Sequence, residues 1–141
     1  MMRVCSASVA IDPPMNGPME QGIWLILGIE KTQSQRISEK WRHLVMNYRL
    51  FSDERDKMNL SLLDINGGLL VISQFTLAAD TNKGLRPSFS SAAAPEQAES
   101  LYHYFLAQAR AQHSKIESGI FAADMQVSLC NDGPVTFNVR V

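Results

Sequence analysis

Hydrophobic residues follow two different spacings along the chain, and the first of them is helical. Between residues 32 and 51 an apolar set recurs at i, i+4, i+7, i+8 and i+11, and it consists of Ile37, Trp41, Leu44, Val45 and Tyr48. This spacing places the set on one face of an α-helix, and either Thr32 or Ser34 is suited to cap its first turn. The segment is therefore predicted to be an amphipathic helix.

A second helical pattern begins at Pro95, a residue type that suits the first turn of a helix. One face of this helix carries the apolar residues Ala98, Leu101, Tyr102, Phe105 and Ala109. Both predicted helices are apolar on one side only. We therefore expect them to pack against a sheet.

Six segments are predicted to be strands because they are apolar throughout or alternate with a period of two. They are 3–11, 22–29, 57–62, 68–75, 120–130 and 134–141. Alternation is most regular in the last two, which have one face made of Phe121, Ala123, Met125, Val127 and Leu129 and of Val135, Phe137, Val139 and Val141. The Asn-Asp-Gly segment at 131–133 predicts a hairpin turn between these two strands.

The order of elements, β-β-α-β-β-α-β-β, predicts an α+β protein in which antiparallel pairing dominates. A chain of 141 residues is the size of one ordinary domain, and the sequence contains no linker, repeat or low-complexity stretch that divides it. We therefore expect a single domain, 1–141.

Composition excludes several classes of protein. The 45% hydrophobic and 19% charged fractions are typical of a globular protein, and the longest apolar run, at 22–29, is too short to cross a bilayer. No secretory signal is recognised at the N-terminus, so a cytoplasmic location is expected. The net charge of −1 argues against nonspecific coating of nucleic acid, although the basic residues at 55–57 and 82–86 are suited to local phosphate contacts. Taken alone, either cluster is also typical of a solvated loop.

Metal and cofactor chemistry finds no support in the motifs. The sequence contains no G-x-S-x-G, Walker, H-E-x-x-H or G-x-G-x-x-G pattern, and we expect no cofactor. The histidines lack an i,i+4 partner and are interpreted as surface or boundary residues. Cys5 and Cys130 are too far apart in sequence for a C-x-x-C site and are interpreted as buried, reduced thiols.

Two polar stretches of the sequence are not needed to form a hydrophobic core. The apolar strand at 68–75 ends in Ser-Gln-Phe-Thr, residues 73–76, which is also typical of a strand that reaches solvent. The second stretch is Asn-Asp-Gly-Pro at 131–134, where Pro134 also suits the start of an edge strand. The residue pattern alone leaves both alternatives open.

The segments SQFTLAAD (73–80), KGLRPSFS (83–90) and FAADMQVSLCNDGPVTF (121–137) occur in this order along the chain. Together they resemble the D-aminoacyl-tRNA deacylase family, and the similarity covers nearly the whole chain. The resemblance implies a barrel-like core of antiparallel sheets with two helices packed outside, and a homodimer. It also implies hydrolysis of D-amino acids from mischarged tRNA, a proofreading activity with tRNA as partner and with neither DNA nor a membrane.

The resemblance further implies roles for particular residues. Gly133 and Pro134 match a cis peptide that one subunit inserts into the active site of the other, where main-chain atoms reject L-aminoacyl-tRNA but pass glycyl-tRNA, including glycine on the alanine tRNA. Arg3 matches an arginine that braces this loop. This chain has only two residues before Arg3, fewer than is usual in the family.

The resemblance places the catalytic pocket at Ser73, Gln74, Phe75 and Thr76. Its substrate-binding lining is implied to include Phe121 and Met125. Thr76 is the one candidate side-chain nucleophile, yet it has no adjacent histidine or lysine in the sequence. The family instead implies hydrolysis assisted by the 2′-hydroxyl of the substrate. A tRNA-end binding module without catalysis and a small-molecule hydrolase are the alternative functions.

Overall fold

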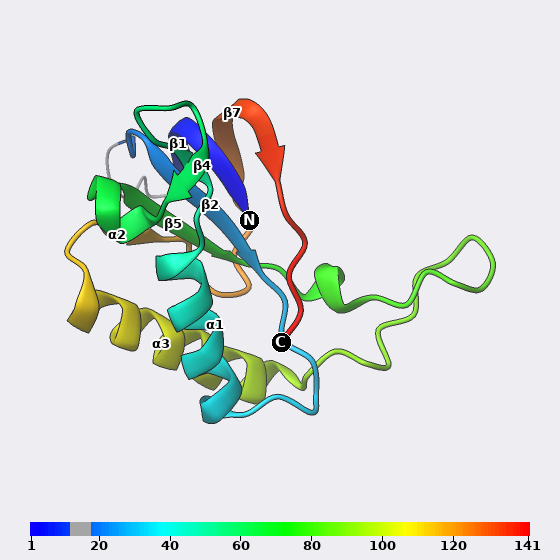
Figure 1. Ribbon diagram of the computed structural model, residues 1–141. Helices are drawn as coiled ribbons and strands as arrows, with labels where there is room; N and C mark the ends of the chain where they lie inside the picture. The colour runs from blue at the N-terminus through cyan, green and yellow to red at the C-terminus, as the bar shows by residue number, and fades with distance from the viewer. Residues whose placement is uncertain (12–17) are drawn as a thin grey trace.

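The computed structural model describes residues 1–11 and 18–141 and contains a layered α+β fold (Figure 1). Within these residues the strands are β1 (Met2–Ala10), β2 (Gly22–Leu27), β3 (Phe51–Ser52), β4 (Met58–Leu60), β5 (Gly68–Ser73), β6 (Ile116–Ser118) and β7 (Gln126–Thr136). The helices are α1 (Gln35–Asn47), α2 (Leu62–Ile65) and α3 (Pro95–Gln112), with a 3₁₀ helix, η1, at Phe75–Ala78. Both predicted helices are confirmed as α1 and α3, whereas α2 was not predicted.

Five strands form one mixed sheet in the order β6-β5-β2-β1-β7. β1 is antiparallel to β2 and β7, whereas β5 is parallel to both β2 and β6. The sheet is therefore mixed instead of built on antiparallel pairing throughout, and the described strands do not close into the expected barrel. The reason is connectivity: α1 lies in the crossover from β2 to β5 and α3 in the crossover from β5 to β6, and such crossovers return the chain parallel to itself.

One face of the sheet is covered by α1 and α3 (Figure 1). The predicted apolar face of α3 is confirmed, since the side chains of Ala98, Leu101, Tyr102, Phe105 and Ala109 are all buried. They pack in a core with residues of β2 and β5, including Ile23, Leu25, Leu69 and Val71. Ser34 is the N-cap residue of α1.

The opposite face of the sheet carries a smaller cluster. Its buried members are Val4, Ala7, Val9, Met19, Leu70 and Ile72, with partly buried Trp24, Met125, Val127 and Leu129 packed against them. Every residue of β7 is half-buried or exposed. This face is therefore less completely covered than the face beneath the helices.

The predicted hairpin at 131–133 is wrong. β7 stays paired with β1 on both sides of this segment, because Val4 pairs with Asn131 and Met2 with Thr136. Between these two pairs β1 advances by two residues, whereas β7 advances by five. The turn-forming residues therefore form a bulge within one strand. The predicted strands also shift: β7 begins at Gln126 instead of residue 120 and ends at Thr136, and β6 was not predicted.

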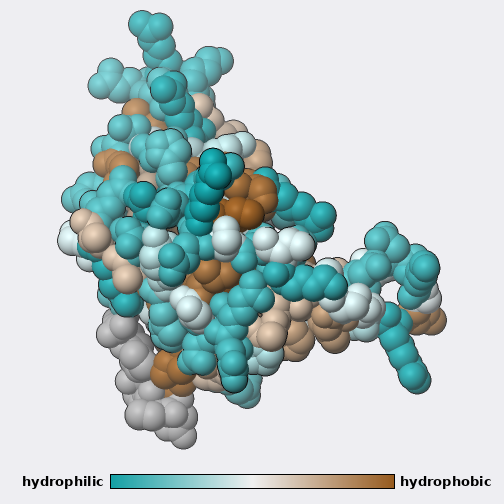
Figure 2. Space-filling model, turned by 90° about the horizontal axis from the view of Figure 1, so that it is seen from below, coloured by the Kyte–Doolittle hydropathy of each residue, from teal (hydrophilic) through white to brown (hydrophobic). Residues whose placement is uncertain are grey.

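An extended arm leaves the body between η1 and α3 (Figure 1). Asp80 and Ser88 pair across its base through reciprocal backbone hydrogen bonds of 2.8 and 2.9 Å. Figure 2 shows the arm projecting from the body, with hydrophilic residues over most of its tip. The basic residues at 82–86 lie here and are exposed, so their proposed contact with phosphate stays a prediction.

The structure corrects two further expectations. Cys5 and Cys130 are both exposed instead of buried. His113 is buried, with its Nε2 atom 2.6 Å from the carbonyl oxygen of Gly67. In the described residues no group of three or more side chains is placed to hold a metal ion, and none of the helices there is long and apolar enough to span a membrane.

Candidate functional site

The polar stretch at 73–76 lies where a buried central strand emerges from the sheet. β5 is flanked by β2 and β6, and its residues are buried until Ser73. The backbone N–H of Gln74 donates to the carbonyl of Leu27 at 3.0 Å, and the chain then turns into η1. The carboxyl ends of parallel strands are a recurrent place for ligand binding in mixed sheets.

A cleft of about 700 Å³ opens at this edge of the sheet. Its walls come from the 73–76 segment, the base of the arm, the start of α3 and the loop before β7. The lining includes Ser73, Gln74, Phe75, Thr76, Phe89, Ala93, Phe121, Ala122, Asp124 and Met125. The structure thus brings together the six residues that the family resemblance assigned to the pocket of one chain.

Aromatic side chains at the cleft are unusually accessible. Phe75 is 60% exposed and Phe89 is 40% exposed, and their ring centroids lie 5.1 Å apart. Such surfaces are suited to stacking of an unpaired base. Sequence reasoning did not assign Phe89, which lies within the KGLRPSFS segment and comes to the cleft only through the course of the arm.

The cleft has little acid–base chemistry of its own. Asp124 is the one ionisable side chain among the described residues that line it. The hydroxyl of Thr76 accepts a hydrogen bond of 2.8 Å from Nε2 of Gln74, an amide that cannot remove a proton at neutral pH. The expectation that Thr76 has no adjacent base therefore agrees with the geometry.

Tyr102 is a buried residue that packs against the wall of the cleft that contains Phe121. Its hydroxyl lies 2.9 Å from the carbonyl oxygen of Gly119 and 3.2 Å from that of Val71, and its ring packs near Phe121 at a centroid distance of 6.0 Å. The side chain is 1% exposed, and burial raises the pKa of Tyr102 to about 12. The neutral phenol thus links α3 to β5 and to the loop that carries Phe121.

Gly133 and Pro134 lie in the bulge of β7 and do not line this cleft. The peptide bond between them is cis, and Gly133 has a φ of +129°, which side-chain-bearing residues rarely adopt. Asn131 brackets the turn, since its Oδ1 accepts a hydrogen bond of 3.3 Å from the N–H of Val135. Among the residues that line the cleft, the one nearest to this turn in sequence is Val127.

Arg3 joins this bulge to the body of the protein. Its Nε donates to the carbonyl of Asp132 at 3.1 Å and lies 3.4 Å from Oδ2 of the same residue. Its Nη1 donates to the carbonyl of Leu50 at 3.0 Å. Arg3 thus contacts the residue before Gly133, and its role as a brace of the Gly133–Pro134 loop stays a prediction.

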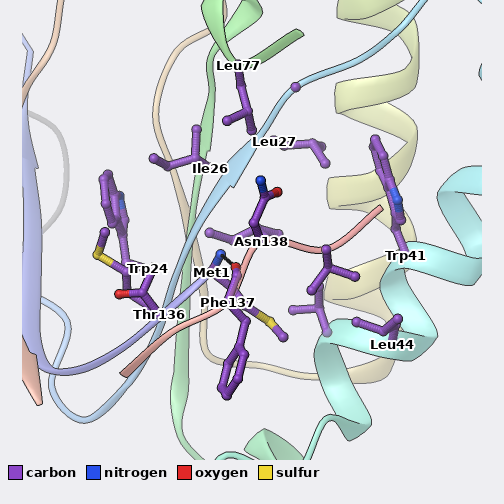
Figure 3. Close-up of a pocket in the computed structure, with 15 residues that line it drawn as sticks. Met1, Trp24, Ile26, Leu27, Trp41, Leu44, Leu77, Thr136, Phe137 and Asn138 are labelled. Carbon is purple, nitrogen blue, oxygen red and sulfur yellow. Dashed lines mark hydrogen bonds between the residues drawn. The ribbon is translucent and has the colours of Figure 1, made fainter. Parts of the chain in front are cut away.

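A second, smaller cavity lies between β2, α1 and the chain after β7 (Figure 3). It has a volume of about 260 Å³, and Figure 3 shows Met1, Trp24, Trp41, Phe137 and Asn138 among the side chains around it. The buried indole Nε1 atoms of Trp24 and Trp41 have no hydrogen-bond partner among the described residues. Its walls are mainly apolar, and the residues assigned from sequence do not line it.

The fold defines a mixed α+β protein with an open cleft at the carboxyl ends of parallel strands. The family model for D-Tyr-tRNA(Tyr) deacylase matches residues 1–140, and the chain belongs to this family. It is 58% identical to the D-aminoacyl-tRNA deacylase of Pseudoalteromonas translucida and 56% identical to that of Cellvibrio japonicus. Each match covers 100% of this chain and 97% of the relative.

Solved structures show the same architecture. The c-Myc DNA Unwinding Element Binding Protein superposes with a TM-score of 0.93 at 37% identity, covering 99% of this chain and 95% of the other. A probable eukaryotic D-amino acid tRNA deacylase superposes with a TM-score of 0.83 at 12% identity, covering 94% of this chain and 92% of the other. The second likeness concerns the fold alone.

Proposed function

We propose that this protein hydrolyses the ester between a D-amino acid and the 3′ end of tRNA, releasing the free amino acid and the tRNA. The family supports this reaction, and the cleft at the end of β5 has the volume and the exposed aromatic rings to hold an aminoacylated adenosine. The observation that carries the mechanism is the scarcity of ionisable groups. Asp124 is the one such side chain among the described residues of the cleft.

In the proposed mechanism, main-chain groups stabilise the charge that develops on the ester carbonyl. The first N–H groups of a short helix have no partner within it, and those of Phe75 and Thr76 begin η1 at the cleft. They are suited to hold the carbonyl oxygen as it becomes an oxyanion. The 2′-hydroxyl of the terminal ribose assists the attacking water, and the 3′ oxygen leaves with the proton that the water gives up.

Selection against L-aminoacyl-tRNA is proposed to come from a second copy of this chain. The Gly133–Pro134 turn of that copy enters the cleft and presents main-chain atoms at the α-carbon, so an L side chain collides whereas hydrogen fits. Support comes from Arg3 and Asn131, which hold the turn in place, and from β7, which is nowhere fully buried in the isolated chain. The same wall passes glycine, so glycyl-tRNA, including glycine on the alanine tRNA, is a proposed substrate.

The active form is therefore proposed to be a homodimer of single-domain chains that works in the cytoplasm, where aminoacyl-tRNA is used. A C2 arrangement places each turn in the cleft of the other chain and leaves both sites equivalent. Light scattering tests this point. A fully active species with the mass of one chain would exclude a site shared between copies.

Release of D-tyrosine from D-tyrosyl-tRNA by the purified protein tests the function. Expected are rapid release from the D ester, release from glycyl-tRNA, and little release from the L ester. A tRNA-binding module without catalysis would retard the tRNA on a gel and leave the ester intact. A small-molecule hydrolase would cleave a free D-tyrosine ester as fast as the tRNA ester.

A further inference from the structure

Cys5 and Cys130, which most of the chain separates in sequence, are neighbours on adjacent strands. In the antiparallel pairing of β1 with β7, Val4 faces Asn131 and Ser6 faces Cys130. Cys5 is therefore an extra residue between two consecutive pairs, which is the geometry of a β-bulge. This places it directly beside Cys130 across the strand boundary.

The bulge in β1 at Cys5 also changes the direction in which the side chain of Cys5 points. In a regular strand Cys5 and Ser6 would lie on opposite faces, yet both are exposed, whereas Val4 and Ala7 on either side are buried. The thiol of Cys5 consequently shares the accessible face of the sheet with that of Cys130. Its Sγ lies 3.6 Å from the carbonyl oxygen of Cys130.

The side chain of Cys5 also affects the ionisation of Cys130. A hydrogen bond with the Cys5 thiol, followed by its charge and by burial, raises the pKa of Cys130. In a β-bulge two consecutive residues of one strand face a single residue of the other, so Cys5 and its neighbour Ser6 both face Cys130. Facing residues on antiparallel strands have Cα atoms about 4.5–5.5 Å apart. This separation lies within the range of about 4.4–6.8 Å that a disulfide spans.

We propose that Cys5 and Cys130 form a reversible thiol–disulfide site that clamps the bulge carrying Gly133 and Pro134. The oxidant is a low-molecular-weight disulfide of the glutathione class. Cys5 lies two residues from Arg3, and Cys130 lies two residues from Asp132, so the bond joins the strands beside the contact between these side chains. The disulfide holds β1 and β7 together where the pairing register is irregular.

The exchange balances in two steps. The thiolate of one cysteine attacks glutathione disulfide, forming a mixed disulfide and releasing one glutathione thiolate. The thiolate of the second cysteine then attacks the protein sulfur of the mixed disulfide, and the second glutathione leaves. Two protein thiols lose two electrons and two protons, and one glutathione disulfide gains them as two glutathione thiols.

Peptide mapping of the full-length protein tests the bond itself. The reduced protein is incubated with glutathione disulfide, its remaining thiols are blocked, and it is digested without reductant. The expected product joins the peptides of Cys5 and Cys130 with the loss of two hydrogen atoms, and dithiothreitol restores both thiols. Stable glutathione adducts on the parent protein, a disulfide between chains, or two unreacted thiols would each overturn the proposal.

Cys5→Ser and Cys130→Ser are the matched variants, because each keeps one thiol at the same place. In both variants the reaction is expected to end at the mixed disulfide, with glutathione still bound to the protein. This result would show that the second thiol displaces glutathione in the parent. Hydrogen exchange of the 126–136 segment tests the clamp and is expected to slow by about threefold or more on oxidation of the parent alone. Unchanged exchange in a protein whose disulfide has formed would overturn the clamp. These measurements do not use deacylation, so their outcome is independent of the proposed function.

Discussion

The cleft at the end of β5 and the bulge of β7 are built in opposite ways. The cleft encloses about 700 Å³ between half-exposed aromatic and small side chains. In the bulge, by contrast, Arg3 joins the carbonyls of Asp132 and Leu50, and Asn131 accepts a hydrogen bond from Val135 within the bulge itself. The cleft is thus suited to receive a ligand, whereas the bulge presents a fixed shape.

In the proposed function, this structural difference separates substrate binding by the cleft from substrate selection by the bulge. An open apolar cleft tolerates many ligands, because apolar contacts depend little on their exact geometry. A braced backbone turn excludes a ligand by the position of a few atoms, and it needs support to keep that position. We therefore expect substitutions in the bulge to affect the reaction more strongly than those that remove one polar side chain from the cleft.

The largest effect is expected for Gly133→Ala. An added Cβ would lie 2.7 Å from Cγ2 of Val135, at a residue with a φ of +129°. The turn must shift, and a displacement of this kind is expected to lower kcat/KM on D-tyrosyl-tRNA by roughly 100-fold. Stopped assays on the purified variant measure this loss, with circular dichroism to verify the fold.

Gly84→Ala is the matched control for backbone strain. Gly84 also has a positive φ, +69°, but an added Cβ meets no described atom within 4 Å. Its cost is expected to be about 1 kcal/mol of stability with little loss of deacylation. Equal losses of activity in the two variants would show that the surroundings of Gly133 have no special importance.

A smaller effect, about tenfold in kcat/KM, is expected for Arg3→Met. The change keeps the length of the side chain but removes its hydrogen bonds to the carbonyls of Asp132 and Leu50. A turn that has lost this support should also discriminate less well, so the ratio of rates on D and L esters is expected to fall. Arg49→Met, which removes a surface hydrogen bond to Asn59, is the control. Lost stability with an unchanged D/L ratio would limit Arg3 to a structural role.

Tyr102→Phe is expected to lower the free energy of unfolding by about 1–2 kcal/mol, with a minor effect on activity at neutral pH. The folded-state pKa of Tyr102 is raised from 10.0 to about 12, so its contribution to stability is complete below pH 10 and declines as the pH rises toward 12. Denaturant titrations over this range should show the decline in the parent and a weaker one in the variant. Tyr48→Phe, a change at a partly exposed tyrosine, is the control. An identical pH dependence in parent and Tyr102→Phe would contradict this assignment.

The smallest effect is expected for Thr76→Ala, in spite of its position in the cleft. The hydroxyl accepts a hydrogen bond from Gln74, and its loss is expected to cost no more than about fivefold in kcat. Single-turnover assays with D-tyrosyl-tRNA measure the change. Complete loss of turnover with binding retained, together with an acyl-enzyme trapped on the parent, would establish covalent catalysis.

Much of the cleft was predictable because its residues occupy contiguous segments. The end of the apolar strand at Ser73 drew attention to the 73–76 stretch, and the family resemblance supplied Phe121 and Met125. Phe89 and Asp124 were not assigned. The first reaches the cleft from the arm, and the second occupies a loop that the pattern had predicted as strand.

The bulge was predicted less well. Asn-Asp-Gly is a strong local signal for a hairpin, yet here both flanking segments pair with the same strand, β1. Local turn propensity does not specify the partner of a strand, and the register shift that aims Cys5 toward Cys130 leaves no mark in the sequence. The interpretation of the two thiols as buried failed for the same reason.

The sequence by itself determined the two long helices, the buried face of α3, and the strand that ends at the 73–76 stretch, because periodicity acts over a few neighbouring residues. Its motifs also determined the family. Tertiary structure alone decided that the sheet is mixed, that β7 continues through Gly133 and Pro134, and that Arg3 contacts Asp132 across 129 positions of sequence. These features arise from pairings between distant segments, whose free energy depends on the packing of the whole fold and not on any local pattern.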